Sequence, residues 1–138
     1  MSGASLRMAG IAVAAVALIG LVGWLLWPSP PAATALHSGT TRYVVSATID
    51  PPRIGSADVT IDLTARNGTA QAASVTVEAV TPLMGFATPA RPATAAGAGR
   101  YTVTGVPLMM TGPWELHVSI AGPGGGSDDL TLPFTVSG

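Results

Sequence analysis

The hydrophobic positions of the chain follow two patterns, which change near residue 30. Residues 8–27 read MAGIAVAAVALIGLVGWLLW and contain no charged or strongly polar side chain. A helix rises about 1.5 Å per residue, so twenty residues span roughly 30 Å, the thickness of a bilayer hydrocarbon core. The pattern predicts a transmembrane helix over residues 8–27, preceded by a short cytoplasmic head over residues 1–7.

Beyond residue 40 the hydrophobic residues recur at every second position, which is typical of strands buried on one face. The clearest run places Val59, Ile61 and Leu63 between polar neighbours, and turn signals such as Asn67 followed by Gly68 separate such runs. Six or seven short strands with regular turns predict an all-β sandwich over residues 41–138. Pro133, on the outward face of the last run, predicts an edge strand.

Three segments lack a clear period. Residues 28–40 are rich in proline and alanine and are expected to form an extended, mobile linker. Residues 82–99 are expected to form a long irregular connection. Asp128 and Asp129 follow a glycine run, which predicts a solvated turn that could make a weak cation contact.

The flanks of the apolar segment indicate its orientation. Arg7 precedes it, and Trp24 and Trp27 lie where an aromatic belt is expected. This favours a single-pass signal anchor in the cell membrane, with the domain on the extracytoplasmic side. A cleaved signal peptide is the alternative, because residues 33–35 read ATA and cleavage there would leave a chain beginning at Leu36. Either outcome exports the domain.

Composition narrows the classes of function. Six basic residues, all Arg, face seven acidic ones, so no nucleic-acid partner is expected. The chain has no Cys, so an exported domain must rely on its hydrophobic core. His37 lies in the predicted linker and His117 on an outward strand face, and no nucleophile, zinc, calcium or phosphate-loop motif is present. We therefore expect no enzyme activity and no catalytic residues.

The methionines are the remaining candidates for chemistry. Met84, Met109 and Met110 lie next to Gly or Pro, or near them, at predicted loops or strand ends. Thioether sulfur is a soft ligand that suits Cu(I), so these residues form a candidate metal site. The alternative is that they fill irregular gaps in the core.

The second half of the chain resembles the YtkA-like domain, a small exported immunoglobulin-like module. The resemblance rests on residues 81–86 (TPLMGF), on 99–101 (GRY) and on 108–116 (LMMTGPWEL), which occur in the family's order, and it covers about residues 42–121. Met84 matches the second Met of the family's Met-Pro-x-Met-Gly loop, and Met110 matches the Met of its Met-x-Gly-x-Trp turn. Gly112 and Trp114 of that turn are expected to serve the fold, as a tight turn and a core aromatic. Thr81 and Phe86 depart from the family pattern, since soft ligands usually occupy those two positions.

The resemblance implies an immunoglobulin-like β-sandwich of the kind found near copper-handling and oxidase-assembly proteins. From it we expect a non-catalytic, membrane-anchored accessory or binding module with a possible link to copper. The alternative is a Cu(I) metallochaperone that uses Met84 with Met109 or Met110. In either case the expected partners are the membrane, through residues 8–27, and a protein in or near it.

Overall fold

The computed structural model describes residues 3–27, 32–66, 72 and 74–138. The chain divides into two units, one of residues 1–30 and one of residues 31–138. The first unit contains helix α1, Gly3–Leu26, which ends just before the predicted proline stop. None of Arg7–Leu26 is buried, and this segment is long and apolar enough to cross a membrane. The predicted N-terminal apolar helix is confirmed.

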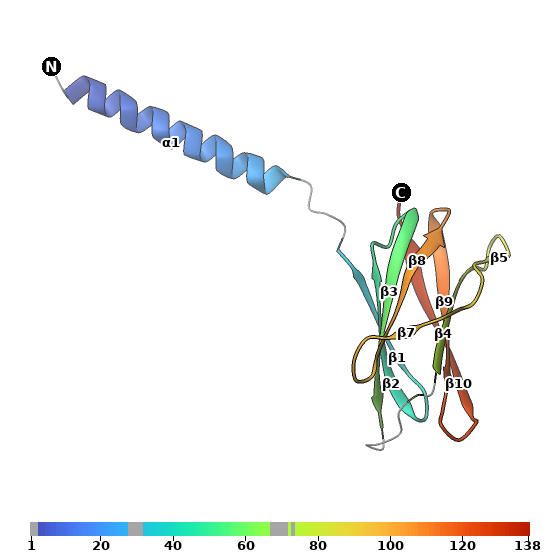
Figure 1. The fold of residues 1–138 in the computed structure, drawn as a ribbon. Helices are drawn as coiled ribbons and strands as arrows, with labels where there is room; N and C mark the ends of the chain where they lie inside the picture. The colour runs from blue at the N-terminus through green and yellow to red at the C-terminus, as the bar shows by residue number, and fades with distance from the viewer. Residues whose placement is uncertain (1–2, 28–31, 67–71, 73) are drawn as a thin grey trace. The chain divides into compact units, whose positions relative to one another are not determined.

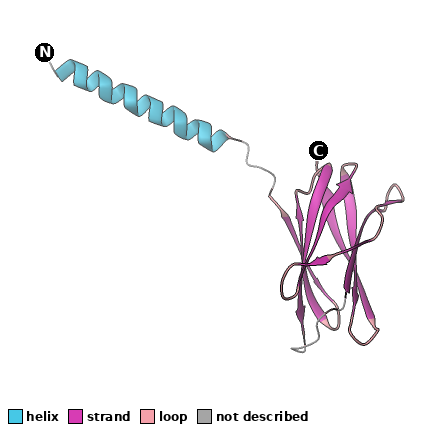
Figure 2. Cartoon of the chain, viewed as in Figure 1, coloured by secondary structure: helices cyan, strands magenta, loops and turns pink. Residues whose placement is uncertain are grey.

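The second unit is all β, with strands that form two sheets (Figures 1 and 2). One sheet has the order β1-β2-β3-β8-β7, and the other has the order β10-β9-β4-β5, with β6 pairing with β4. The strand bounds are β1 Thr34–Gly39, β2 Tyr43–Asp50, β3 Gly55–Ala65, β4 Ser74–Thr81, β5 Phe86–Ala87, β6 Arg91–Pro92, β7 Thr94–Ala95, β8 Arg100–Leu108, β9 Gly112–Ala121 and β10 Ser127–Val136.

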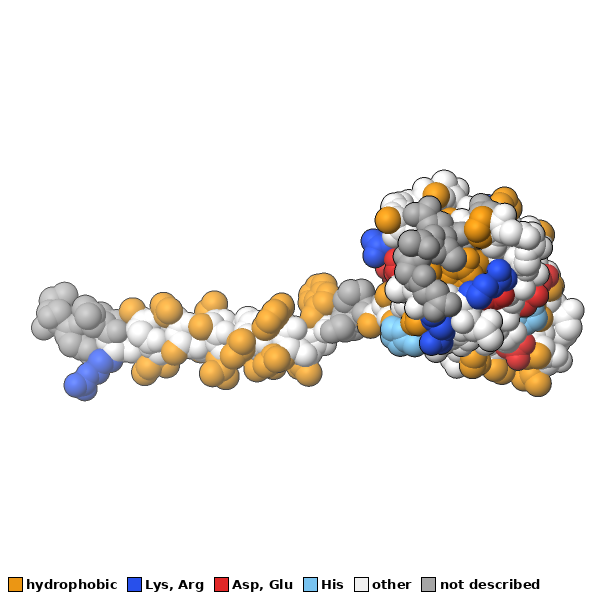
Figure 3. Space-filling view, turned by 90° about the horizontal axis from the view of Figure 1, so that it is seen from below, with side chains coloured by type: hydrophobic (Ala, Val, Ile, Leu, Met, Phe, Trp, Pro, Cys, Tyr) orange, Lys and Arg blue, Asp and Glu red, His pale blue; other side chains and the backbone are white. Residues whose placement is uncertain are grey.

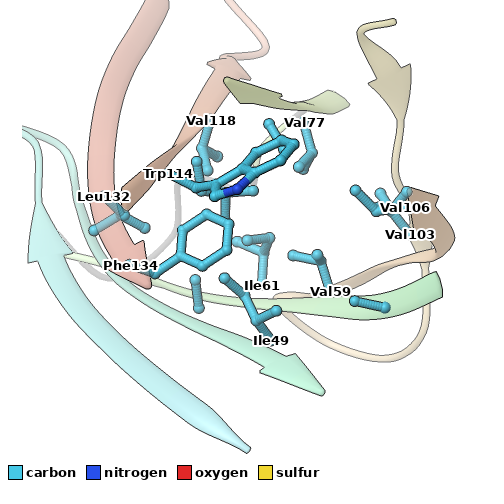
Figure 4. Close-up of a cluster of buried hydrophobic side chains, with 14 of the residues drawn as sticks. Ile49, Val59, Ile61, Val77, Val103, Val106, Trp114, Val118, Leu132 and Phe134 are labelled. Carbon is cyan, nitrogen blue, oxygen red and sulfur yellow. The ribbon is translucent and has the colours of Figure 1, made fainter. Parts of the chain in front are cut away.

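The core lies between the two sheets and comes from the predicted alternation. Figure 4 shows Ile49, Val59 and Ile61 from one sheet opposite Val118 and Phe134 from the other. Trp114 is 1% exposed, and its ring lies nearly perpendicular to the Phe86 ring, with a centroid distance of 6.3 Å. Each buried aliphatic side chain contributes about 1.5–3 kcal/mol, so this layer supplies the stability that a Cys-free domain needs. The predicted all-β sandwich is confirmed.

One boundary prediction is wrong. Residues 34–39, placed in the linker, form strand β1, which pairs with β2 from Thr34↔Ile49 to Gly39↔Val44. The hydrophobic pattern missed this strand because only Leu36 packs against the core, while backbone hydrogen bonds to β2 supply the rest of the pairing. The seven strands of six or more residues still match the predicted number, with β1 among them.

Two other expectations change. Residues 82–99 are less irregular than predicted, since they contain the two-residue strands β5, β6 and β7. Asp128 and Asp129 lie within strand β10 and do not form a turn. Pro133 does lie on an edge strand, since β10 ends its sheet. The predicted turn at Asn67 and Gly68 and residues 28–31 of the predicted linker fall outside the described residues.

Candidate functional site

The strand registers gather three connections at one end of the sandwich. The loop 51–54 follows β2, the turn 82–85 follows β4, and residues 109–111 join β8 to β9. Gly55 of β3 lies opposite Leu108, and Val80 of β4 lies opposite Glu115 of β9, so all three connections leave the sheets on the same side. We call this the methionine end; residues 137–138 and the start of β1 also lie there.

Met84 lies in the turn between β4 and β5. The amides of Met84 and Gly85 donate hydrogen bonds to the carbonyl of Thr81, at 3.3 and 3.0 Å, and Gly85 adopts a φ of +64°. Glycine takes this left-handed conformation without a Cβ penalty. This turn directs Met84 toward solvent, and the residue is 70% exposed.

Met109 and Met110 point into different environments. Met109 is 63% exposed, whereas Met110 is half-buried and packs against the core. The Met110 carbonyl accepts a 2.9 Å hydrogen bond from the Trp114 indole N–H, and Gly112 between them has a φ of +116°. Gly112 and Trp114 therefore serve the fold, as the sequence predicts.

The expectation that the methionines fill core gaps is thus correct for Met110 and wrong for Met84 and Met109. Short turns hold the two exposed thioethers outside the sheets, where no core side chain covers them. The structure brings Met84 and Met109 to the same end of the domain, on turns after β4 and β8. Soft sulfur ligands displayed in this way are chemically suited to Cu(I).

A second candidate site lies on the outer face of the β10-β9-β4 sheet. A hollow of about 250 Å³ is lined there by residues of three strands and the nearby loop, including Glu78, His117 and Asp129. The His117 Nε2 atom lies 3.2 Å from a carboxylate oxygen of Glu115, and the His117 side chain is 41% exposed. The outward, solvated histidine predicted from the sequence is confirmed.

The sequence does not reveal the neighbours of His117, because Glu78 faces it from another strand of the sheet. This hollow is open to solvent, and its lining mixes polar residues with the apolar residues Ala90, Val118 and Leu130. Within the described parts of the chain, no group of three or more His, Cys, Asp and Glu side chains is arranged to hold a metal ion.

The opposite end of the domain carries an ion pair that sequence reasoning missed. The Arg42 guanidinium binds a carboxylate oxygen of Asp128 at 2.6 Å, and the Thr40 hydroxyl donates to the other oxygen at 2.6 Å. These two hydrogen bonds, that of Arg42 first, hold the pKa of Asp128 below its ordinary value. The pair links the β1–β2 turn to β10, so Asp128 has a structural role.

Comparison with known proteins supports the fold and nothing finer. No protein-family profile and no curated protein matches the chain, so the YtkA-like resemblance stays a prediction. A solved structure that is similar is FetP of uropathogenic E. coli strain F11, expressed recombinantly in the periplasm. The match has a TM-score of 0.56 and 11% identity and covers 78% of this chain and 97% of FetP. At this identity the likeness shows that the two proteins share a fold.

Proposed function

We propose that the protein is a membrane-anchored, extracytoplasmic accessory module that binds a partner and catalyses no reaction. The observation that carries the proposal is the contrast between the two units. The sandwich has a complete core of its own, whereas residues 8–26 of the helix carry no charged side chain and none of Arg7–Leu26 is buried. A helix that is hydrophobic on all sides and is not covered by protein is stable in the hydrocarbon core of a membrane.

The likeness to FetP supports the extracytoplasmic location, since FetP was obtained from the periplasm. Strand β1 supports retention of the anchor. Cleavage after Ala35 would remove Thr34 and Ala35, whose backbones pair with Ile49 and Thr48 of β2. An uncleaved chain keeps the full β1 ladder.

The binding role is tested by photo-crosslinking in intact cells. A crosslinking amino acid is placed at an exposed domain position, with Ser56, Thr131 and Met84 as separate sites on different faces. We expect at least one site to capture a membrane or envelope protein. The control carries residues 1–33 fused to an unrelated soluble domain. Equal capture by this control, or no capture from any face, would contradict an accessory role.

A second candidate function is a Cu(I) metallochaperone that uses Met84 with Met109. The exposure of both thioethers at the methionine end favours it, because an exposed methionine contributes little to a core. Met110 was part of the predicted ligand set, but its packing against the core makes it the weaker ligand of the three. The departures at Thr81 and Phe86 leave this site with few soft ligands.

A further inference from the structure

The large hydrophobic side chains that the sandwich exposes are unevenly distributed. Among residues 32–66, 72 and 74–138, four of the five most exposed lie at the methionine end: Ile54 (48%), Leu83 (78%), Met84 (70%) and Met109 (63%). The fifth, Val44, is 46% exposed and lies at the start of β2, at the other end. Single exposed hydrophobic residues that are scattered over a surface need no explanation. Exposed hydrophobic residues at the tips of three separate loops, all at one end of the domain, do need one.

The opposite end of the domain is polar. The Arg42–Asp128 and Arg100–Asp62 ion pairs lie there, together with the glycine-rich turn 122–126. Figure 3, which views the domain from that side, shows Arg and Asp or Glu side chains on this face. The exposed large hydrophobic side chains therefore gather at the methionine end, which also carries the exposed charged residues Asp50, Arg53 and Asp58.

The chain reaches the sandwich at the methionine end. Thr34 begins β1 and pairs with Ile49, one residue before the end of β2 and close to the loop that holds Ile54. Helix α1 ends at Leu26 and β1 begins at Thr34, so only residues 27–33 lie between them. Seven residues reach at most about 25 Å, whereas the eleven residues of β3 extend over roughly 36 Å.

From this arrangement we propose that the methionine end docks on the lipid bilayer, inserting Ile54, Leu83, Met84 and Met109 at the interface between headgroups and acyl chains. The inference rests on the proposed anchoring. A short tether makes the contact intramolecular, so four side chains that would bind lipid weakly on their own become effective. Arg53, exposed beside Ile54, supplies a cation for lipid phosphate.

The surface would then have the composition of an interfacial contact, in which apolar tips enter the membrane and polar backbone turns remain at headgroup depth. It is a lipid contact that we infer, and a protein partner covering the same tips is the competing occupant. The two occupants can be distinguished with a fluorophore at the methionine end, because nitroxide-labelled lipids quench it only when it contacts the membrane.

The test uses the full chain reconstituted into vesicles of phosphatidylethanolamine and phosphatidylglycerol. Because the chain has no Cys, Met109→Cys gives a single site for an environment-sensitive fluorophore, and Val44→Cys gives a site of matched hydrophobic character at the polar end. Nitroxide-labelled lipids report contact with the membrane. We expect a blue shift and at least twofold quenching at position 109 and neither at position 44.

A second set of variants changes the exposed hydrophobic residues while the fluorophore stays at position 109. Leu83→Asp with Met84→Asp, both in an exposed turn, should abolish the quenching at position 109, whereas Met84→Leu should preserve it. Solvent-like emission at position 109 in vesicles that retain the protein would overturn the proposal and leave the anchoring intact. Protection of position 109 in native membranes but not in vesicles would assign the patch to a protein and also overturn it. Failure of the chain to co-float with vesicles would defeat the anchoring itself, and the lipid contact with it.

Discussion

At the scale of single residues, the three methionines differ in exposure, although all three lie at predicted loops or strand ends. Met84 and Met109 present their sulfur atoms to solvent, and Met110 is partly covered by the core. A metal site on this end would therefore depend on the first two. Leucine has a similar volume and hydrophobicity but no sulfur, so it removes a ligand and keeps the surface apolar.

If the domain binds Cu(I), Met84→Leu with Met109→Leu should weaken the affinity by at least about tenfold, or about 1.4 kcal/mol. Met110→Leu is the matched control and should leave the affinity within twofold. Titration with Cu(I) against a competing chelator measures both. Binding no tighter than micromolar in the unaltered protein, or equal affinities for all variants, would eliminate the metallochaperone.

The same residues show which features can be predicted locally. Gly112 and Trp114 were assigned to a tight turn and to the core, and both assignments hold, since a left-handed φ and a large apolar side chain leave local signals. The exposure of Met84 and Met109 has no such signal. It depends on how far each turn extends beyond the neighbouring strands, which the pairing of β4 with β9 and of β3 with β8 determines.

At the scale of elements, the contact between the β1–β2 turn and β10 joins edge strands of the two sheets. Asp128 is the centre of this contact, and its side chain is only 12% exposed. Its folded-state pKa lies below the ordinary value because the Arg42 and Thr40 hydrogen bonds stabilise the carboxylate. Such a group stabilises the fold at pH values above its unfolded pKa, and the contribution is lost as the pH falls through the folded pKa.

We therefore expect Asp128→Asn to lower the urea midpoint of unfolding at about pH 6, with the difference from the unaltered protein shrinking below about pH 4, the pKa region of an unfolded Asp. Arg42→Gln should show the same pH dependence. Because the two side chains act as one pair, the double variant should lose about as much stability as either single variant. A deficit that is unchanged between the two pH values would mean that the charge of Asp128 plays no part.

Strand β1 explains why the element boundaries were harder to predict than the elements themselves. The alternation that revealed β2, β3 and β9 comes from the burial of every second side chain. An edge strand such as β1, in which Leu36 and Thr34 alone are half-buried, is held by backbone pairing and leaves little trace in its side chains. The same holds for Asp128, whose partner lies 86 positions away in the chain.

At the scale of the whole molecule, the inclusion of β1 in the sandwich shortens the connection to α1. The predicted linker of residues 28–40 would allow a reach of about 40 Å, but residues 27–33 allow about 25 Å. If the anchor is retained, as we propose, this tether keeps the sandwich close to the membrane surface. We then expect its partners to be membrane lipids, membrane proteins or molecules delivered to that surface.

The most direct test determines on which side of the membrane the domain lies and measures the mass of the mature chain. Gly124→Cys introduces one thiol in a turn with open space around the added side chain. Cells that express this variant are treated with a membrane-impermeant maleimide, and both the membrane and the soluble fractions are analysed by mass spectrometry. The account predicts labelling before lysis on a chain that retains residues 8–27. Labelling only after lysis, or a labelled chain that begins at Leu36, would contradict it.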